Sequence, residues 1–478
     1  MNGKMTVLLL MVTIYVPTFS IRAAQAQQAM NGTSRSYLPL VESHLRNLTT
    51  SGLDVYGPRE TGNWMAIIDT RTGTYPDFEH TPKRVYRKIG APRGSSLYWD
   101  QPMIVAARQL SDITGKREYA AAADRYIRDF LADGIDENGL FLWGNHCYYD
   151  AFEDRFVKFS GGYHELRPHA AAWDLFWQHD PAVVERYIRT MAARHVYDPA
   201  AGGFNRHDNN QREHAFLEAG GVLVESLAWL YGKTKDRRLL EMALKIARYS
   251  FDRRGETTGL LVNDPDTNRW DSKVCTTEVA VWANSCLRAA EFSGREDFAE
   301  MAGAAVAAYL KYGYDADAGK YFGQLNVKDG KPVTASEIGY WPRKYSDIWN
   351  PDQWPTHDYP MAMAEACLTL HGKTGDPVFF QGAHRWAEIV CRSEPSDRPA
   401  AYAEQYGLCI RFLTRAGVAL KQERYTAKAH ELADEAVARL CESGWFQGYP
   451  ESHLYEAVDG VGYLLLALME LEADALAQ

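Results

Sequence analysis

Glycine residues divide the 478-residue chain into a repeated pattern of paired helices. Short turns with a central glycine close one stretch of helical apolar periodicity and open the next: Thr114–Lys116, Tyr231–Lys233, Ser293–Arg295 and Thr374–Asp376. A glycine after a helix readily adopts the left-handed conformation that ends it, which is typical of helical hairpins. A second set of glycines, each followed by apolar or aromatic residues, closes the second helix of each pair: Gly139, Gly203, Gly259, Gly319 and Gly444.

The length of the repeat indicates the fold class. Paired helices that recur about every 50–65 residues are typical of helical repeat proteins, because one hairpin buries its apolar face only against its neighbours. The second helices carry alanine and large apolar residues three and four positions apart, as in 119–131 and 240–251. We therefore expect an all-α protein whose six or seven hairpins close into an α/α toroid, an incomplete barrel with short β segments at its rim. An irregular helical bundle is the alternative.

The first 26 residues are typical of a secretory signal peptide. Lys4 precedes an apolar run from Met5 to Ile21, and Ala24 and Ala26 supply small residues for cleavage. We expect a signal peptide over 1–26 and one catalytic toroid over 27–478, in a periplasmic or secreted protein that is not held at the membrane after cleavage. An uncleaved membrane anchor is the alternative for this segment.

Charge and cysteine content narrow the choice of partners. The net charge is −10, and the absence of a long basic run argues against nucleic-acid binding. Seven cysteines form no CxxC pair, and their odd number does not suit a disulfide framework. Most of them lie in apolar helical runs, where a thiol packs as a small hydrophobic group.

Three segments of the chain carry the residues of a metal site. His146, Glu165 and His207 follow or begin successive helices, with Arg206 beside His207; Glu165 is expected at the start of a helix over about 163–178. Equivalent loops of a toroid emerge on the same rim, so these residues should converge. Borderline metals favour imidazole nitrogen, and two histidines with one carboxylate leave coordination positions open. His164, His169 and His195 are alternative ligands.

The order and spacing of these pieces resemble polysaccharide lyase family 2, the pectate lyases with an α/α barrel. The resemblance covers most of the mature chain and is carried by the segments 136–146, 164–167, 174–176, 195–198 and 206–207. It implies that His146, Glu165 and His207 hold a divalent transition metal, manganese by preference, and that Arg206 is the Brønsted base. The middle of the chain, 263–355, departs from the family pattern, which leaves the substrate open.

The implied activity is metal-assisted β-elimination of a uronate-containing polysaccharide or oligosaccharide such as polygalacturonate, which leaves unsaturated uronate ends. A metal with open positions neutralises the charge that spreads into the uronate carboxylate when the C5 proton is removed. Arginine has a pKa above about 12, so a base role for Arg206 requires the metal and burial to favour its neutral form. Otherwise Arg206 is a fixed cation, and Lys273 or Tyr148 serves as the base. Because Arg206 and His207 are neighbours with a shared task, we expect them in a loop or at a helix start.

Basic and aromatic residues near these segments are candidates for contact with an acidic sugar chain. Arginine and lysine pair with carboxylates, and aromatic rings stack on sugars. The candidates are Arg93, Trp143, Tyr148, Arg167, Lys273 and Arg343.

Two other reaction classes fit a toroid. A glycoside hydrolase acting on uronyl oligosaccharides needs an acid and a nucleophile or base at fixed separation and no metal. Its carboxylates would come from Asp100, Asp174, Glu278 and Asp358. A sugar epimerase would use paired histidines, and a non-catalytic sugar-binding toroid is the remaining possibility.

Overall fold

The structure is a computed structural model that describes most of the chain after residue 35. The described residues are 36–76, 91, 93–144, 147–158, 164–166, 172–266, 271–333, 344–349, 360–395 and 402–477. The predicted signal peptide, 1–26, lies outside them.

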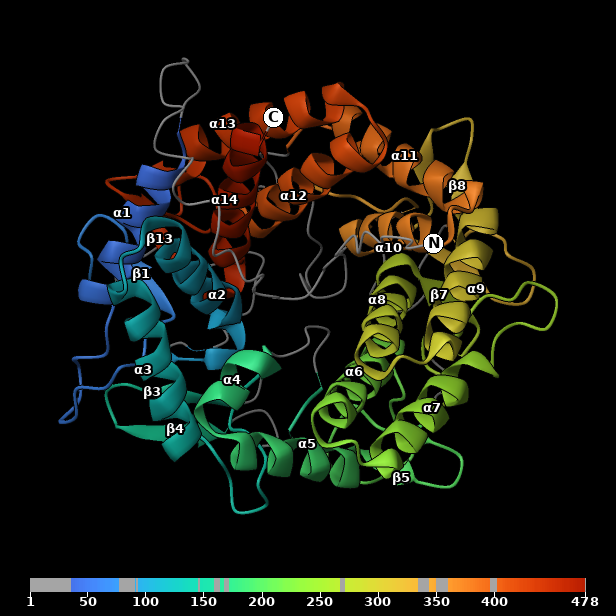
Figure 1. The fold of residues 1–478 in the computed structure, drawn as a ribbon, viewed down its shortest axis with the longest axis horizontal. Helices are drawn as coiled ribbons and strands as arrows, with labels where there is room; N and C mark the ends of the chain where they lie inside the picture. The colour runs from blue at the N-terminus through green and yellow to red at the C-terminus, as the bar shows by residue number, and fades with distance from the viewer. Residues whose placement is uncertain are drawn as a thin grey trace, which may run out of the picture.

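The helices form two concentric rings, which confirms the expected α/α toroid (Figure 1). Seven helices form the inner ring: α2 (Leu97–Thr114), α4 (Trp173–His179), α6 (Leu217–Thr234), α8 (Thr276–Ser293), α10 (Pro360–Thr374), α12 (Ala403–Ala419) and α14 (Val461–Ala477). Seven others lie outside them: α1 (Leu38–Thr50), α3 (Glu118–Asp133), α5 (Pro181–His195), α7 (Arg237–Phe251), α9 (Glu296–Gly313), α11 (Pro377–Arg392) and α13 (Glu423–Leu440). The described residues thus hold seven helical pairs, the larger of the two expected numbers.

Sequence composition decides which helices lie inside. The inner helix α6 is buried along almost its whole length, whereas the outer helix α7 buries one face. Gly221 of α6 lies so close to α8 that a Cβ atom there would be 3.1 Å from the Cα of Trp282. Small residues therefore let neighbouring inner helices approach each other closely, and the amphipathic outer helices cover them.

The two ends of the described chain close the ring. Strand β1 (Ile67–Asp69) pairs antiparallel with β13 (Leu454–Glu456), with Ile68 opposite Tyr455. Helix α14 packs against α2, and Gly462 permits this because a Cβ atom there would be 2.4 Å from the Met103 nitrogen.

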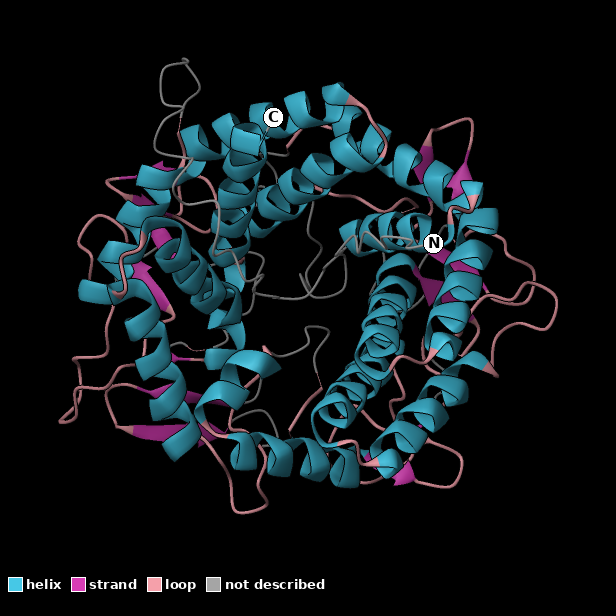
Figure 2. Ribbon diagram, viewed as in Figure 1, coloured by secondary structure: helices cyan, strands magenta, loops and turns pink. Residues whose placement is uncertain are grey.

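The remaining strands are short and lie in the connections between helices (Figure 2). All strand pairs in the described part of the chain are antiparallel. These strands are β2 (Gly94–Ser95), β3 (Cys147–Asp150), β4 (Arg155–Lys158), β5 (Val196–Asp198), β6 (Gly203–Phe204), β7 (Lys273–Cys275), β8 (Tyr314–Asp315), β9 (Lys320–Tyr321), β10 (Gln324–Asn326), β11 (Cys441–Glu442) and β12 (Trp445–Phe446).

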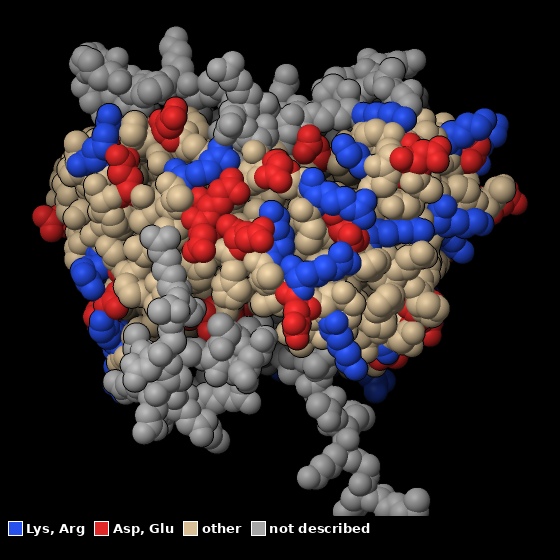
Figure 3. Space-filling model, turned by 90° about the horizontal axis from the view of Figure 1, so that it is seen from above, with Lys and Arg blue, Asp and Glu red and all other residues tan. Residues whose placement is uncertain are grey.

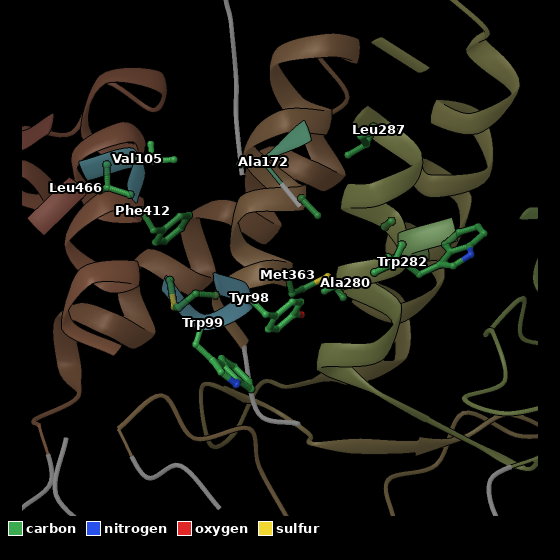
Figure 4. Packing of buried hydrophobic residues seen from close by; sticks show 14 of the residues in the cluster. Tyr98, Trp99, Val105, Ala172, Ala280, Trp282, Leu287, Met363, Phe412 and Leu466 are labelled. Carbon is green, nitrogen blue, oxygen red and sulfur yellow. The ribbon is translucent and has the colours of Figure 1, made fainter. Parts of the chain in front are cut away.

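One hydrophobic core runs through the ring. Inner helices contribute much of it, including Val105, Leu287, Met363, Phe412 and Leu466 (Figure 4). The side of the molecule shows acidic and basic side chains intermixed (Figure 3). All seven cysteines are free thiols, and five of them are buried, as expected for small hydrophobic groups. None of the helices in the described part of the chain is long and apolar enough to cross a membrane.

The glycine pattern predicts most hairpin turns correctly. Gly115, Gly294 and Gly375 have φ of +73°, +70° and +68° and follow the inner helices α2, α8 and α10. The turn predicted at Gly232 is wrong, because α6 continues to Thr234 and Lys235 takes the left-handed conformation with φ +59°. Similarly, Gly202 rather than Gly203 has a positive φ, of +85°.

The helix predicted over about 163–178 is also wrong at 164–166, the described residues at its start. Helix α4 begins only at Trp173, and Glu165 lies in an extended segment opposite His207. The backbone hydrogen bonds between 164–166 and 206–208 supply the reason, since they pair this segment as an extended strand rather than as a helix.

Candidate functional site

Two short extended segments meet at the rim, 164–166 before α4 and 206–208 before α6. The Leu166 amide donates to the Arg206 carbonyl at 2.8 Å, and the Asp208 amide donates to the His164 carbonyl at 3.2 Å. Glu165 stands opposite His207 in this antiparallel bridge. The structure therefore brings Glu165, Arg206 and His207 together from segments about 40 residues apart.

The Glu165 carboxylate is the centre of this group. Its side chain is 2% exposed, and Arg206 forms an ion pair with it through Nη2. His207 Nε2 lies 3.9 Å from Oε1, the same carboxylate oxygen that Arg206 contacts. A buried carboxylate shared by a guanidinium and an imidazole is thus the core of the candidate site.

Neighbours in a regular strand point to opposite faces, yet Arg206 and His207 reach the same carboxylate. They do so because 205–208 is a loop held by its own hydrogen bonds. The Arg206 amide donates to the His214 carbonyl at 2.9 Å, and the His207 amide donates to Asn205 Oδ1 at 3.1 Å. The loop placement agrees with the expectation from their adjacency.

Asn205 organises this loop, a role that its place in the motif did not reveal. Its side chain is fully buried and its Nδ2 donates to Asn209 Oδ1 at 2.6 Å and to the Gln211 carbonyl at 3.0 Å. A side chain that satisfies several backbone and amide groups at once fixes a loop in one conformation. Arg206 and His207 owe their shared direction to it.

An aromatic and histidine layer covers the other side of Arg206. The guanidinium carbon lies 5.1 Å from the centre of the Phe216 ring, and His214 stacks on that ring at 5.7 Å. His214 is also 6.0 Å from His207, ring centre to ring centre, and its Nδ1 lies 3.5 Å from Asp264 Oδ2. From the sequence, Phe216, His214 and Asp264 had no predicted role at the site.

Two buried carboxyl groups lie behind this layer at the starts of α6 and α8. The Glu218 amide donates to Glu278 Oε2 at 3.2 Å. Burial holds the pKa of Glu278 well above its usual range, the negative charge of Glu218 raises it further, and the charge of Arg206 opposes the rise. Glu278 therefore retains its proton more readily than an exposed glutamate.

His164 and His195, the described alternatives as metal ligands, point into the core. His164 Nδ1 contacts His195 Nε2 at 2.9 Å, and His164 Nε2 contacts the Tyr187 hydroxyl at 2.8 Å. Burial lowers the pKa of His164 to about 3 and that of His195 well below its usual value. The nitrogens of both rings are engaged in internal hydrogen bonds, so neither ring is presented to a metal at Glu165. His169 lies outside the described residues.

The structure accounts for two predicted sugar contacts by packing. Trp143 is 5% exposed, lies among Phe141, Phe130 and Tyr187, and donates Nε1 to the Tyr187 hydroxyl at 3.2 Å. Tyr148 is buried in β3, and its hydroxyl donates to Asp150 Oδ2 at 3.4 Å. Neither ring has an open face on which a sugar could stack.

The remaining predicted contacts do not join the Glu165 group in the described structure. Arg93 pairs with Asp150 and Glu153, each at 3.3 Å, and lies over the Phe152 ring. Lys273 begins β7, half-buried, opposite Asn326. His146, Arg167 and Arg343 lie outside the described residues.

The hydrolase carboxylates are not arranged as an open acid pair. Asp100 is fully buried and accepts hydrogen bonds from the hydroxyls of Tyr126 and Tyr455, while Asp174 pairs with Lys233 at 2.6 Å. Glu278 is 2% exposed. Asp358 lies outside the described residues.

The donors present suit the predicted metal. Within the described ranges no three histidine, cysteine or acidic side chains converge closely enough to hold an ion, but Glu165 and His207 supply two of the three predicted ligands. A carboxylate oxygen with an imidazole nitrogen is a donor set for manganese or zinc. The third predicted ligand, His146, lies outside the described residues.

Solved structures define the class of fold. D-mannose isomerase is 10% identical, with a TM-score of 0.52, over 92% of this chain and 98% of that one. A family 76 glycoside hydrolase from a bovine Bacteroides thetaiotaomicron strain is 13% identical, with a TM-score of 0.50, over 92% of this chain and 78% of that one. An unsaturated glucuronyl hydrolase specific for heparin is 11% identical, with a TM-score of 0.48, over 92% and 98% of the two chains. The ring of helical pairs and the two likenesses with TM-scores of 0.50 and 0.52 give the fold as the α/α toroid, and identities of 10% and 13% say nothing of the reaction.

A family comparison is more specific to the candidate site. The family model of periplasmic pectate lyases matches residues 95–219. This range runs from the start of α2 to the start of α6 and contains Glu165, Arg206 and His207. The resemblance to polysaccharide lyase family 2 is therefore confirmed over these residues, and a carbohydrate-processing enzyme is supported.

Proposed function

We propose that this protein cleaves a uronate-containing polysaccharide or oligosaccharide, such as polygalacturonate, by metal-assisted β-elimination. The observation that carries the proposal is the convergence of Glu165, Arg206 and His207 within the range that the pectate lyase family model matches. A sugar polymer or oligomer is the substrate, and the products carry unsaturated uronate ends.

Glu165 and His207, with His146, would hold the divalent metal, manganese by preference. When bound, the metal supplies a Lewis acid that neutralises charge developing on the uronate carboxylate. Glu165 is suited to this because it is held in place by the backbone bridge to His207 and is 2% exposed. A rigid, shielded carboxylate loses little entropy on binding.

Arg206 takes the proton from C5 of the uronate, the C4–C5 double bond forms as the C4–O4 bond breaks, and the departing oxygen takes a proton from water. Arg206 reaches the Glu165 carboxylate, and its side chain is 16% exposed, so one edge remains open to a substrate. The ion pair with Glu165 favours the protonated form of the Arg206 guanidinium. This ion pair must therefore weaken before Arg206 can accept the C5 proton. Of the two alternative bases, Tyr148 is disfavoured, because burial and Asp150 raise its pKa. Lys273 lies in β7 opposite Asn326 and, among the described residues, forms no ion pair with Glu165.

The described carboxylates favour elimination over hydrolysis. Asp100 is closed off by Tyr126 and Tyr455, and Asp174 is neutralised by Lys233. A hydrolase of the uronyl class needs two carboxyl groups that reach the same glycosidic bond. The buried His164–His195 contact likewise does not suit an epimerase that would need paired histidines open to a sugar.

The site is proposed to act in the periplasm or outside the cell, where the predicted signal peptide would direct the chain. Arg93 and Lys273, with Arg167 and Arg343, are proposed to bind uronate carboxylates along the substrate. Arginine and lysine do this through charge-assisted hydrogen bonds.

An absorbance assay tests the proposal. The protein is incubated with polygalacturonate, with and without a chelator, and the ultraviolet absorbance of a double bond conjugated to a carboxylate is followed. We expect absorbance to rise and the chelator to stop it, with added manganese restoring the rate. New reducing ends without absorbance would favour the hydrolase instead.

A further inference from the structure

A line of five buried residues runs from the core to the loop that carries Arg206. Trp143 Nε1 contacts the Tyr187 hydroxyl at 3.2 Å, and that hydroxyl contacts His164 Nε2 at 2.8 Å. His164 Nδ1 contacts His195 Nε2 at 2.9 Å, and His195 Nδ1 contacts the Asn205 carbonyl at 2.9 Å. Every member is at most 6% exposed. Water is thus kept from all four hydrogen bonds.

The two ends of the line fix the direction of every hydrogen bond in it. An indole nitrogen only donates and a backbone carbonyl only accepts. His195 must therefore carry its proton on Nδ1. A neutral His195 then accepts at Nε2 from His164 Nδ1–H, and a neutral His164 accepts at Nε2 from the Tyr187 hydroxyl. Both rings are neutral because no carboxylate among the described residues contacts them, and a lone buried charge is costly.

We propose that Tyr187, His164 and His195 are positioning residues that set Glu165 and His207 through this one-way hydrogen-bond chain. The catalytic meaning of the chain rests on the proposed lyase function, whereas its direction does not. Hydrogen bonds that point the same way polarise one another, so the chain is stiffer than isolated pairs would be.

Each histidine holds one of the two segments that meet at the site. His164 precedes Glu165, and its amide donates to Asp208 Oδ1 at 2.9 Å. Because successive side chains of an extended segment point to opposite faces, anchoring His164 in the core turns Glu165 toward Arg206. His195 binds Asn205 twice, since its carbonyl also accepts from the Asn205 amide at 2.8 Å. Asn205 in turn directs His207.

Tyr187 is the best residue at which to interrupt the hydrogen-bond chain. Its ring stacks on Phe141 at 3.9 Å with an interplanar angle of 9°, so Tyr187→Phe keeps the ring in place and removes only the hydroxyl. Tyr119→Phe is the matched control. Tyr119 is also buried on an outer helix, and its hydroxyl makes a 3.1 Å hydrogen bond to Glu42, away from the site.

The direction of the chain is tested by nitrogen NMR of the protein labelled in its histidine rings. We expect two neutral histidines protonated at Nδ1, the less common form in water, and we expect both signals to shift in Tyr187→Phe and neither in Tyr119→Phe. Fewer than two such histidines, or equal shifts in the two variants, would contradict the proposed hydrogen-bond chain. This experiment needs no substrate and stands whether or not the protein is a lyase.

The positioning role is tested by metal titration and kinetics. Loss of an outer partner of a metal ligand costs about 10–100-fold in affinity or activity. Tyr187 contacts His164, the residue before Glu165, rather than a ligand itself, so Tyr187→Phe should weaken manganese binding or lower kcat by up to about tenfold, with KM little changed. Tyr119→Phe should change none of these quantities. Wild-type values of metal affinity and kcat in Tyr187→Phe would overturn the positioning role, whereas a wild-type protein without lyase activity would count against the proposed function alone.

Discussion

Two buried arginine–glutamate pairs in this toroid use the same chemistry in different ways. Arg288 of α8 donates two hydrogen bonds to Glu225 of α6, one to each carboxylate oxygen. Arg288 Nη2 also donates to Ser285 Oγ at 3.2 Å. Arg206 contacts only Oε1 of Glu165, and its Nε has no hydrogen-bond partner among the described residues. The first pair joins two helices, and the second joins two loops at the rim.

The difference separates a structural ion pair from a candidate catalytic one. In the Arg288 pair the donors are matched to the acceptors, and the side chains are 9% and 1% exposed. In the Arg206 pair the same glutamate oxygen also faces His207 at 3.9 Å, and the arginine is 16% exposed. Bidentate pairing fixes geometry, whereas a single contact leaves both partners able to take another. We therefore expect changes in one pair to affect folding and changes in the other to affect turnover.

The largest effect is expected for Arg206→Ala. Loss of a general base lowers turnover by about 10²–10⁴-fold. The variant also leaves the buried Glu165 carboxylate without its arginine, but His207 stays beside that carboxylate, so the loss of stability should be smaller than in Arg288→Ala. Initial rates on polygalacturonate measure turnover, and a thermal melt measures the stability of the variant. Turnover at the wild-type level would remove Arg206 as the base.

Arg288→Ala should show the reverse pattern. It leaves the Glu225 carboxylate buried without its partner, which destabilises a protein by about 3–5 kcal/mol. Urea unfolding should detect this loss, while the kcat of the folded fraction stays near the wild-type value. A stable but inactive Arg288→Ala protein would contradict the division between the two pairs.

The glutamates extend the comparison to metal binding. Glu165→Gln removes a proposed ligand, so manganese affinity should fall by more than the roughly 10–100-fold that loss of an outer partner costs. Glu225→Gln is the control and should bind the metal as the wild type does. Titration calorimetry measures both. Equal affinities in Glu165→Gln and wild type would exclude Glu165 as a ligand.

Asp100 shows what happens to a buried carboxyl without an arginine. Burial raises its pKa to about 7, against hydrogen bonds from Tyr126 and Tyr455 that lower it. The unfolded pKa is about 3.9. The folded state therefore binds the proton more tightly, and the stability from this group is full below about pH 4 and is lost as the pH rises toward 7.

The direction of this pH dependence can be measured with Asp100→Asn, whose side chain stays neutral at every pH. The free energy of unfolding of the wild type, relative to Asp100→Asn, should fall between pH 5 and about 7 and then level off. A relative stability that rises with pH would show that Asp100 is charged in the folded protein.

The smallest effect is expected at the Phe216 ring beneath Arg206. A cation–π contact is worth about 0.5–1 kcal/mol, so Phe216→Leu should lower kcat/KM about two- to fivefold. Phe251→Leu removes the contact of Arg254 with the Phe251 ring, at 4.0 Å, and serves as the control. If both variants lower kcat/KM equally, the ring beneath Arg206 has no special role.

Local sequence signals predicted the toroid because they act over a few residues. Gly115, Gly294 and Gly375 end helices whether or not the rest of the chain is present, since only glycine adopts positive φ without strain. The same reasoning failed at Gly232, where a lysine three residues later ends the helix instead. Tertiary packing of α6 favours the longer helix over the local signal.

The candidate site was predictable only in part, for a related reason. Repeat position placed Glu165, Arg206 and His207 on one rim, but it did not show that Glu165 is extended or that Asn205 directs His207. Phe216 and Tyr187 were missed, because their roles depend on residues distant in the sequence that packing brings into contact. Trp143 suits sugar stacking by its residue type, and only the structure shows that it is buried among other rings.

The central claim is that the glycosidic bond is broken by elimination at a metal-dependent site. The most direct measurement is the mass of the products from a defined oligogalacturonate cleaved in isotopically labelled water. For metal-dependent elimination, the two products together have the mass of the substrate, carry no label, and do not form when a chelator is present. Products that together gain one molecule of labelled water would show hydrolysis and contradict elimination.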